Sequence, residues 1–371
     1  MITFLIFLVL LYSMTKLSEK IMRSNKKIGN LFLLFPVILL TLFCGLRYSG
    51  TDFLVYNKEF YRVQNYTFFG AIKDGVEPGL AFLMKVSYII STENTIPYFL
   101  LISFLTNIIF CYAVKKYTNN FSFAILLYVL SFTYFSTFNI SGQYIAIMIT
   151  FWGMQYLIKL DKKKYLICIM IAFLFHYSSL IMLLLAIIPK NNYKVDVKKV
   201  LQVIVFGFLV LFSYPLLEKV IFFIPLLGEK YFVFLQELYN FKREASLAHI
   251  LIFIIQIFFL FYYRNELFRK QKSADNQIKI YYFTMSFLIS GVFVLLSQNN
   301  VFWIRLGSYF SIYIIVLISE ILISIKKIEK PIWYYIVLVF YFTICLYLLL
   351  TGSGEVYPFK LRMFDSIYQL R

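Results

Sequence analysis

Cysteine, histidine and charged residues are all scarce in this chain, and these shortages narrow what the protein can be. The four cysteines stand singly in or beside apolar runs, so they predict small buried side chains rather than a metal site or a disulfide framework (Cys44, Cys111, Cys168 and Cys345). Neither a P-loop nor a G-x-G-x-x-G motif occurs, which argues against ATP or dinucleotide chemistry. Charged residues make up 15% of the chain, against about 25% in soluble proteins, which excludes an ordinary water-soluble domain.

Apolar sequence, by contrast, is abundant. Hydrophobic residues make up 61% of the chain, and its mean hydropathy is +0.78. Apolar runs of about 17 to 20 residues, the length that crosses a bilayer core, recur throughout. We therefore predict an all-α, polytopic integral membrane protein, with one transmembrane domain over residues 1–371 and about 10–12 transmembrane helices plus re-entrant or short helices. The predicted spans are 1–17, 30–46, 96–114, 121–137, 143–158, 199–217, 248–263, 280–297, 303–325 and 332–350.

Two further apolar segments leave their membrane crossing open. Segment 78–92 is short and carries Lys85, and segment 165–189 is interrupted by polar residues around His176. Each either crosses once or enters the membrane and returns. The first apolar run of the chain lacks a basic n-region and a small-residue cleavage site, so we expect a retained helix rather than a cleaved signal.

The basic residues distinguish these arrangements, because cytoplasmic loops collect Lys and Arg. If both ambiguous segments make an even number of crossings, 23 of the 36 Lys and Arg fall on one face; if both cross once, the split is 17 to 19. We predict the first arrangement, with both termini outside. Orientation and contact with anionic lipid then account for the net charge of +18 without a nucleic-acid partner. The predicted cytoplasmic loops are 16–29, 115–120, 159–164, 190–199, 264–279 and 326–330.

This topology places the longer polar segments, 47–77 and 218–247, on the outer face, where the unusual polar residues also gather. Arg47 ends the second span, Glu77 precedes Pro78 at the expected start of a helix, and His176 lies within an apolar run. Ionisable residues in membrane spans are costly and tend to mark functional paths. The structural alternatives are snorkelling for the arginines, capping for the carboxylates and a core position for the histidine. The rest of the set is Asp52, Tyr56, Asn139, Gln143, Arg305 and Tyr309.

Five segments in order carry a resemblance to a known family. They are "LRYSGTDFLVYNKEF", "EPGLAFLMKVSYII", "NISGQYIAIMI", "FLFHYSSLIML" and "RLGSYFSIYIIVL", and the match covers about residues 40 to 315. Together they resemble the EpsG/Wzy-like family of bacterial polysaccharide polymerases. Each motif is weak alone, and the ordered set is fairly specific. Where the family pattern N-x-x-R-Q has arginine, this chain has Gly142 before Gln143, so Arg47 or Arg305 would have to supply that charge.

The resemblance implies a membrane glycosyltransferase with an architecture similar to the C-type enzymes. Such polymerases act at the outer face of the bacterial plasma membrane. They transfer a growing glycan from polyprenyl diphosphate to a hydroxyl of the next lipid-linked oligosaccharide repeat unit, building capsule, exopolysaccharide or O-antigen. The partners implied are that lipid-linked substrate and the bilayer, while partnership with a chain-length regulator is left open.

This chemistry assigns roles to the outer-face residues. The departing diphosphate needs fixed positive charge, which arginine supplies in bidentate form, so Arg47 and Arg305 are the expected diphosphate ligands. A carboxylate or histidine must accept the proton of the acceptor hydroxyl; Glu77 is the first candidate, followed by Asp52 and His176. No cofactor or metal is expected, although Asp52 and Glu77 are suitable Mg²⁺ ligands. The expected glycan-binding residues are Asn139, Gln143, Tyr56 and Tyr309.

Two other functions fit a polytopic membrane protein. A flippase for lipid-linked oligosaccharide would distribute polar residues along a cavity reaching both faces, and no internal repeat of the transporter kind is visible here. A membrane acyltransferase would pair a histidine with a carboxylate, and His176 has no acidic residue near it in the sequence. A structural subunit of a secretion complex has no positive feature behind it. The sugar, its linkage and the stereochemistry are not encoded in any recognisable pattern.

Overall fold

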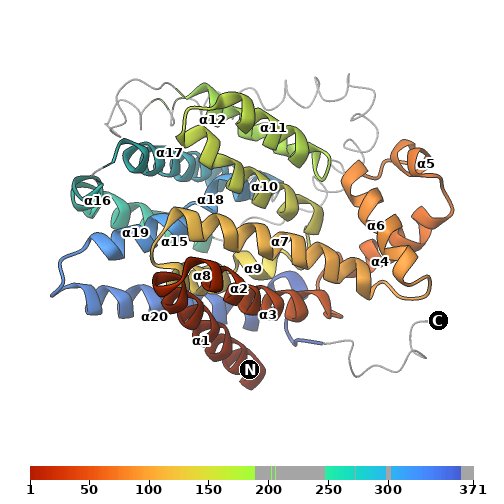
Figure 1. The fold of residues 1–371 in the computed structure, drawn as a ribbon, viewed down its shortest axis with the longest axis horizontal. Coiled ribbons are helices and arrows are strands. Elements are labelled where there is room, and N and C mark those ends of the chain that lie inside the picture. Colours follow the sequence, from red (N-terminus) through yellow and green to blue (C-terminus); the bar gives the residue numbers. More distant parts are fainter. Residues whose placement is uncertain (189–201, 203–204, 206–246, 272, 298–301, 361–371) are drawn as a thin grey trace. The chain divides into compact units, whose positions relative to one another are not determined.

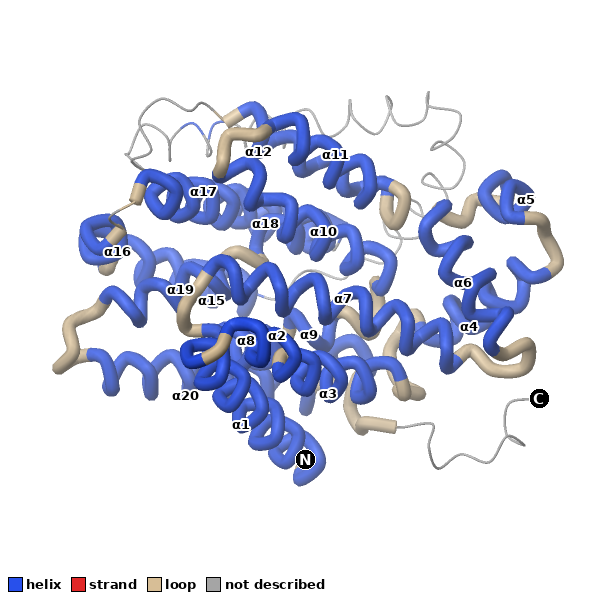
Figure 2. Tube along the Cα trace, in the orientation of Figure 1, coloured by secondary structure: helices blue, strands red, loops and turns tan. Residues whose placement is uncertain are grey.

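The computed structural model of the chain describes residues 1–188, 202, 205, 247–271, 273–297 and 302–360 (Figure 1). Within these residues all regular secondary structure is helical, as predicted (Figure 2). Six helices or helix pairs in this part of the chain are long and apolar enough to cross a membrane, and a bent pair would make a seventh. The six are α1 (Ile2–Ser24), α2 with α3 (Lys26–Phe32 and Leu34–Gly45), α7 (Ile96–Tyr117), α17 (Ala274–Leu296), α18 with α19 (Phe302–Ser311 and Ile314–Ser324) and α20 (Lys330–Leu350).

Other predicted spans take different forms. Residues 121–137 form two helices, α8 (Phe121–Leu130) and α9 (Thr133–Ser136), separated by Phe132 in a left-handed conformation. Residues 143–158 lie within a single helix, α10 (Ser141–Ile158). The predicted span 199–217 and the outer segment 218–247 lie outside the described residues, apart from residues 202, 205 and 247.

The chain groups into two compact units. The first comprises residues 1–155, 163–180 and 325–371, and the second comprises residues 156–162 and 181–324. The prediction of one transmembrane domain stays a prediction.

In the first unit the spanning helices pack through aromatic side chains. Helix α3 lies along α7, while α1 contacts α2, α3 and α8. The rings of Phe7 and Phe43 stack at 4.3 Å between α1 and α3, and Phe7 also stacks on Tyr134 of α9. Because these rings stand at helical spacing on apolar runs, the sequence pattern that marks the spans also supplies the interior of the unit.

One end of the first unit is formed by loops predicted to be cytoplasmic. The carboxylate of Glu19 accepts hydrogen bonds from the backbone N–H and the hydroxyl of Ser122, at 3.0 and 2.6 Å. Lys115 donates to Asn30, and the amide of Asn120 donates to Tyr334. Each contact links a residue of a predicted cytoplasmic loop to a residue within four positions of another such loop, in agreement with the charge distribution. An arrangement with one crossing for each ambiguous segment would place residues 115–120 on the opposite face from residues 16–29.

The ambiguous segment 78–92 forms the short helix α6 (Pro78–Ile90), and its two flanks meet the same helix, α4 (Phe53–Gln64). Before α6, Asp74 pairs with Arg62 at 2.7 Å. After α6, the hydroxyl of Tyr61 donates to the carbonyl of Glu93. Since Tyr61 and Arg62 are neighbours on α4, both flanks of α6 are held at the same place, which agrees with the predicted return of segment 78–92. Between α4 and α6 lies α5 (Phe68–Lys73).

The second ambiguous segment is a broken helix. Helix α11 (Lys162–Phe173) is followed by a break at residues 174–176, a 3-10 helix (η1, Tyr177–Met182) and α12 (Leu183–Ile187). The ammonium group of Lys162 donates to the carbonyl of Ala186 at 2.5 Å. The segment thus returns to the end from which it started, as an even number of crossings requires.

The second unit contains α15 (Leu247–Tyr262), α16 (Arg264–Lys270), α17, α18 and α19. Helices α15 and α16 are bent by 53° at Tyr263 and form the bent pair mentioned above. A buried ion pair, Lys279 with Glu320 at 3.1 Å, joins α17 to α19. The rings of Phe293 and Phe310 stack at 5.5 Å and join α17 to α18.

Candidate functional site

The end of the first unit opposite Glu19 is built from three segments that are far apart in the sequence. Backbone N–H groups of residues 48, 50 and 51 donate to the carbonyls of Lys360, Glu355 and Gly354. The side-chain amide of Asn139 also donates to the carbonyl of Gly354, at 3.0 Å. The loop after α3, the turn before α10 and the residues after α20 therefore meet in one junction, and all three were predicted on the outer face.

Asn139 fills the space between two glycines of this junction. A Cβ on Gly50 would lie 2.5 Å from the Asn139 Oδ1, and a Cβ on Gly354 would lie 2.6 Å from its Nδ2. Both glycines have positive φ, +109° and +66°, which L side chains rarely adopt. The position of Asn139 is thus explained by packing within the protein, while its predicted role in glycan binding stays a prediction.

The buried side chain of Arg47 forms hydrogen bonds inside the same junction. Its side chain is buried, with the residue 1% exposed, and its terminal nitrogens donate to the carbonyls of Cys44 and Phe138 at 2.7 Å each. The Ser141 hydroxyl accepts a further hydrogen bond at 3.2 Å, and the guanidinium lies 4.8 Å from the ring of Phe99. Within the described residues no carboxylate lies in salt-bridge range of Arg47, and its Nε has no hydrogen-bond partner.

Two consequences follow for Arg47. A buried cation without a paired carboxylate raises the local positive potential, which favours negative charge nearby. Its terminal nitrogens already donate hydrogen bonds to the end of α3 and to the turn before α10. Arg47 would therefore act on a diphosphate through its positive electrostatic potential and not through bidentate hydrogen bonds. The snorkelling alternative does not describe this side chain, because it is not exposed.

The start of α6 supplies the first chemical group of the site. Glu77 is the N-cap residue of α6 and Pro78 is its first residue, as the sequence predicted. The N–H of Gly79 donates to the carbonyl of Leu174, at 2.7 Å, in the break between α11 and η1. A Cβ on Gly79 would lie 2.7 Å from the ring of Phe175 and 2.9 Å from the Leu174 carbonyl oxygen, so this close approach requires glycine.

A second glycine supports the break from the other side. A Cβ on Gly142, in the first turn of α10, would lie 2.8 Å from Leu80 and 3.2 Å from the carbonyl oxygen of Phe175. The backbone of residues 174–176 is thus seated between the N-terminal turns of α6 and α10. Irregular backbone at membrane depth is tolerated where protein buries it or a cavity receives it, and this seat provides that surrounding.

The seat brings Glu77 and His176 together. The His176 Nδ1 lies 3.3 Å from the Glu77 Oε1, with the side chains 27% and 14% exposed. A carboxylate that accepts a hydrogen bond from the Nδ1–H leaves Nε2 as the basic nitrogen of the imidazole. No acidic residue stands near His176 in the sequence, because its partner Glu77 caps the start of α6, 99 positions earlier.

Two tyrosines lie within electrostatic range of this pair. The half-buried Tyr56 of α4 accepts a long, 3.4 Å hydrogen bond from the N–H of Gly142. Burial, followed by the negative charges of Asp52 and Glu77, raises the pKa of Tyr56 well above its ordinary value, so its hydroxyl stays protonated. Tyr98 of α7 is fully buried within range of Tyr56, Glu77 and Arg47, and its hydroxyl has no hydrogen-bond partner among the described residues.

Tyr98 was not among the predicted site residues. It follows Pro97 in the first turn of an apolar helix and is one of 31 tyrosines, so no sequence signal distinguished it. The same is true of Gly79 and Gly142 as packing positions. Their importance arises from contacts with segment 174–176, which sequence order does not reveal.

The remaining predicted residues are located as follows. Asp52 is the N-cap residue of α4 and accepts a hydrogen bond from the Thr51 hydroxyl at 3.1 Å. Gln143 is buried in the first turn of α10. Arg305 and Tyr309 belong to α18 in the second unit, where Arg305 is half-buried and Tyr309 is buried. The structure therefore groups Glu77, His176, Tyr56 and, through its charge, Asp52. The roles of Arg305 and Tyr309 stay predictions.

Metal ligation gains no support from the described residues. They contain no group of three or more His, Cys, Asp or Glu side chains that could hold an ion. The four cysteines are all buried and unpaired, in agreement with their interpretation as small interior side chains. The polar groups that the structure brings together here are the Glu77–His176 pair and the two tyrosine hydroxyls near it.

Comparison with models of known families gives a match over most of the chain. The model of a family described as the EpsG family matches residues 30–361, a range that includes every predicted site residue. No curated protein and no solved structure matches the chain.

Proposed function

The chain belongs to the EpsG family, and from that premise we propose that it is a glycosyltransferase that polymerises polysaccharide repeat units. Membership of the family and the apolar helices make it a multi-pass membrane protein with a role in polysaccharide biosynthesis. The proposed substrate is a glycan on polyprenyl diphosphate, and the proposed acceptor is the next lipid-linked repeat unit. The proposed place of the reaction is the outer face of the plasma membrane.

The observation that carries this proposal is the Glu77–His176 pair, 3.3 Å apart and half-buried. Glycosyl transfer to a hydroxyl needs a base of moderate strength close to the reacting oxygen. His176 Nε2 fits that need better than a carboxylate alone, since Glu77 keeps the proton on Nδ1 and stabilises the imidazolium that forms. This changes the sequence-based order of candidates, with His176 as the base and Glu77 as the residue that orients it.

The proposed step balances as follows. The acceptor hydroxyl gives its proton to His176 Nε2, and its oxygen forms a bond to the anomeric carbon of the growing glycan. The bond from that carbon to the diphosphate oxygen breaks, and its electron pair leaves with the lipid diphosphate. Fixed positive charge lowers the energy of the departing group, and the buried cation of Arg47 is available for this through its field. Arg305 is proposed as a direct ligand.

The test is the length of glycan chains in cells that lack this gene and express single variants. Glu77→Gln and His176→Gln should leave single repeat units on the lipid, exposed at the outer face, with few or no long chains. Asp74→Asn is the matched control, because Asp74 is also a carboxylate before α6, but it pairs with Arg62 on α4. Blots of the membrane fraction establish equal abundance.

Other outcomes would point to other functions. Repeat units retained at the cytoplasmic face in the null strain would indicate a flippase. The pair also fits acyl transfer, since a histidine with a carboxylate partner is what that chemistry uses. Long chains of normal length without acyl groups would therefore indicate an acyltransferase and refute polymerisation.

A further inference from the structure

One face of α4 contacts the first turn of α7 through three side chains, two by ring contacts and one by accepting a hydrogen bond. The pairs are Phe53 with Phe99, Asn57 with Thr95, and Phe60 with Tyr98, at 5.1, 2.7 and 5.9 Å. Residues 53–60 extend about 10 Å along α4, whereas residues 95–99 extend about 6 Å along α7. Two helices that run side by side advance by equal lengths, so α4 crosses the start of α7.

This crossing places α4 at the depth where a spanning helix begins. Helix α7 is long and apolar enough to cross a membrane, so its first turn lies near the membrane surface. A helix that lies across that turn is close to the plane of the membrane. Figure 1 shows α4 and α6 at the end of α7 where the chain enters that helix. The predicted topology makes this end the outer one.

The opposite face of α4 combines apolar with basic side chains. Leu54, Val55 and Tyr61 are exposed at 56%, 61% and 40%, and Lys58 and Arg62 are exposed between them. These five residues follow the spacing of one helical face, called the α4 face below. Arg62 also takes part in exposed ion pairs, so Lys58 is the main cation of this face.

The end of α6 extends the apolar part of this surface. Ile89 and Ile90 are exposed at 86% and 70%. They lie close to α4, because the Tyr61 hydroxyl donates to the carbonyl of Glu93 just after α6. Adjoining apolar side chains with this degree of exposure indicate a surface that contacts lipid or protein rather than water.

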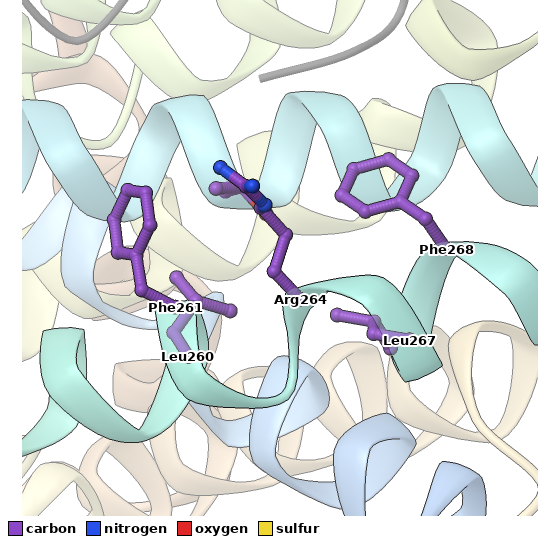
Figure 3. Close-up of a pocket in the computed structure, with 6 residues that line it drawn as sticks. Leu260, Phe261, Arg264, Leu267 and Phe268 are labelled. Carbon is purple, nitrogen blue, oxygen red and sulfur yellow. The ribbon is translucent and has the colours of Figure 1, made fainter. Parts of the chain in front are cut away.

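The chain combines the same kinds of side chain where the apolar helix α15 is followed by the basic helix α16. There Arg264 stands among large apolar residues, and its guanidinium carbon lies 5.8 Å from the centre of the Phe261 ring (Figure 3). A long cationic side chain covers apolar surface with its stem and carries its charge toward lipid headgroups and water. Cations beside large apolar side chains thus occur at a second helix end of this protein.

We propose that the α4 face binds the outer surface of the bilayer. Leu54 and Val55 lie at the level of the upper acyl chains, and Lys58 lies at the level of the lipid phosphates. A helix with apolar and basic residues that lies in the membrane plane is typical of interfacial helices, and anionic lipid strengthens such binding. Lysine is depleted in protein–protein interfaces, which favours lipid over a second copy of the chain. This binding is independent of the Glu77–His176 pair and of the proposed polymerase activity.

The experiment measures the depth of a fluorophore on the α4 face. Val55→Cys in the purified, full-length protein is labelled with bimane, and the four native cysteines give little background because they are buried. The protein is reconstituted in vesicles of phosphatidylethanolamine and phosphatidylglycerol. The quenchers are a shallow lipid nitroxide near the top of the acyl chain, a deep one near its end, and iodide in the water.

Two labelled controls calibrate the depth. Val339→Cys on α20 is the matched control, because Val339 is also 61% exposed but lies on a helix long enough to span the membrane. Lys73→Cys is the aqueous control, at an exposed position on α5. Bimane at Val55→Cys should lose most of its fluorescence to the shallow nitroxide and little to iodide. The deep nitroxide should be the strongest quencher at Val339→Cys, and iodide should be the strongest at Lys73→Cys.

Leu54→Cys supplies a second labelled position if Val55→Cys is poorly produced. Iodide quenching of Val55→Cys equal to that of Lys73→Cys, without an effect of either nitroxide, would place the α4 face in water and overturn the proposal. Protection from all three quenchers would also overturn it and assign the face to a protein partner. Stronger quenching by the deep nitroxide than by the shallow one would refute the interfacial position.

Discussion

Substitution of Gly79 by alanine tests whether the close packing of α6 on the α11–η1 break creates the site. The new Cβ would lie 2.7 and 2.8 Å from two atoms of the Phe175 ring and 2.9 Å from the carbonyl oxygen of Leu174. Contacts below 3.0 Å do not persist, so the break must move away from α6. That movement also stretches the 2.7 Å hydrogen bond from the Gly79 N–H to Leu174 and displaces the adjacent His176.

Gly79→Ala is expected to lower the stability of the protein modestly and its activity strongly. Overpacking by one methyl group costs about 1–3 kcal/mol, while alanine gains up to about 1 kcal/mol over glycine in a helix, so the net loss of stability is modest. The Glu77–His176 distance of 3.3 Å, however, is only slightly shorter than the limit of a hydrogen bond. A displacement of a few tenths of an ångström breaks it, and a misplacement of about 1 Å costs on the order of 100-fold in rate.

The assay is the glycan chain-length distribution together with the amount of protein in the membrane. Gly79→Ala should be present at near wild-type abundance and should make as few long chains as Glu77→Gln. Gly70→Ala on α5 is the control, because its Cβ meets only side-chain atoms of Thr67 and Tyr66, the nearest at 3.1 Å. Chains of wild-type length from Gly79→Ala at normal abundance would refute the idea that this seat positions His176.

Two further predictions concern the junction and the topology. Arg47→Lys should lower the free energy of unfolding of the purified protein by about 2–3 kcal/mol, because one ammonium group cannot bond the carbonyls of both Cys44 and Phe138. Arg62→Lys, at an exposed ion pair, is the control, and equal stability of the two variants would contradict the role given to Arg47. The topology can be tested by cysteine labelling, because the four native cysteines are buried and give a low background. A membrane-impermeant maleimide should label Glu93→Cys in intact cells and Lys27→Cys only after permeabilisation, and the reverse pattern would show that the predicted orientation is inverted.

The features that sequence predicted are those set by local composition. Apolar runs and their helical spacing predicted an all-helical membrane protein, because burial in lipid demands backbone hydrogen bonds within each segment. The distribution of Lys and Arg grouped the loops, and the contacts of Glu19 with Ser122 agree with that grouping. The start of α6 was readable as well, because proline after Glu77 fits only the first turn of a helix.

Contacts between distant segments could not be predicted in this way. Arg47 has the same sequence context whether it faces a diphosphate or bonds the carbonyl of Phe138, 91 residues away. His176 lacked an acidic neighbour in the sequence, and its partner became visible only with the fold. The tertiary structure also brought the flanks of each ambiguous segment together, which agrees with the arrangement that the charge count favoured.

Sequence alone therefore determined that this chain is a helical membrane protein and which family motifs it carries, and it predicted which of its loops share a face. Each of these depends on residue type and spacing, which are local properties. The tertiary structure decided that Glu77 and His176 form a pair and that Arg47 is buried in a junction. It did so because Gly79 and Gly142 let three backbone segments approach more closely than any side chain would allow, and such an approach depends on how segments far apart in the chain pack together.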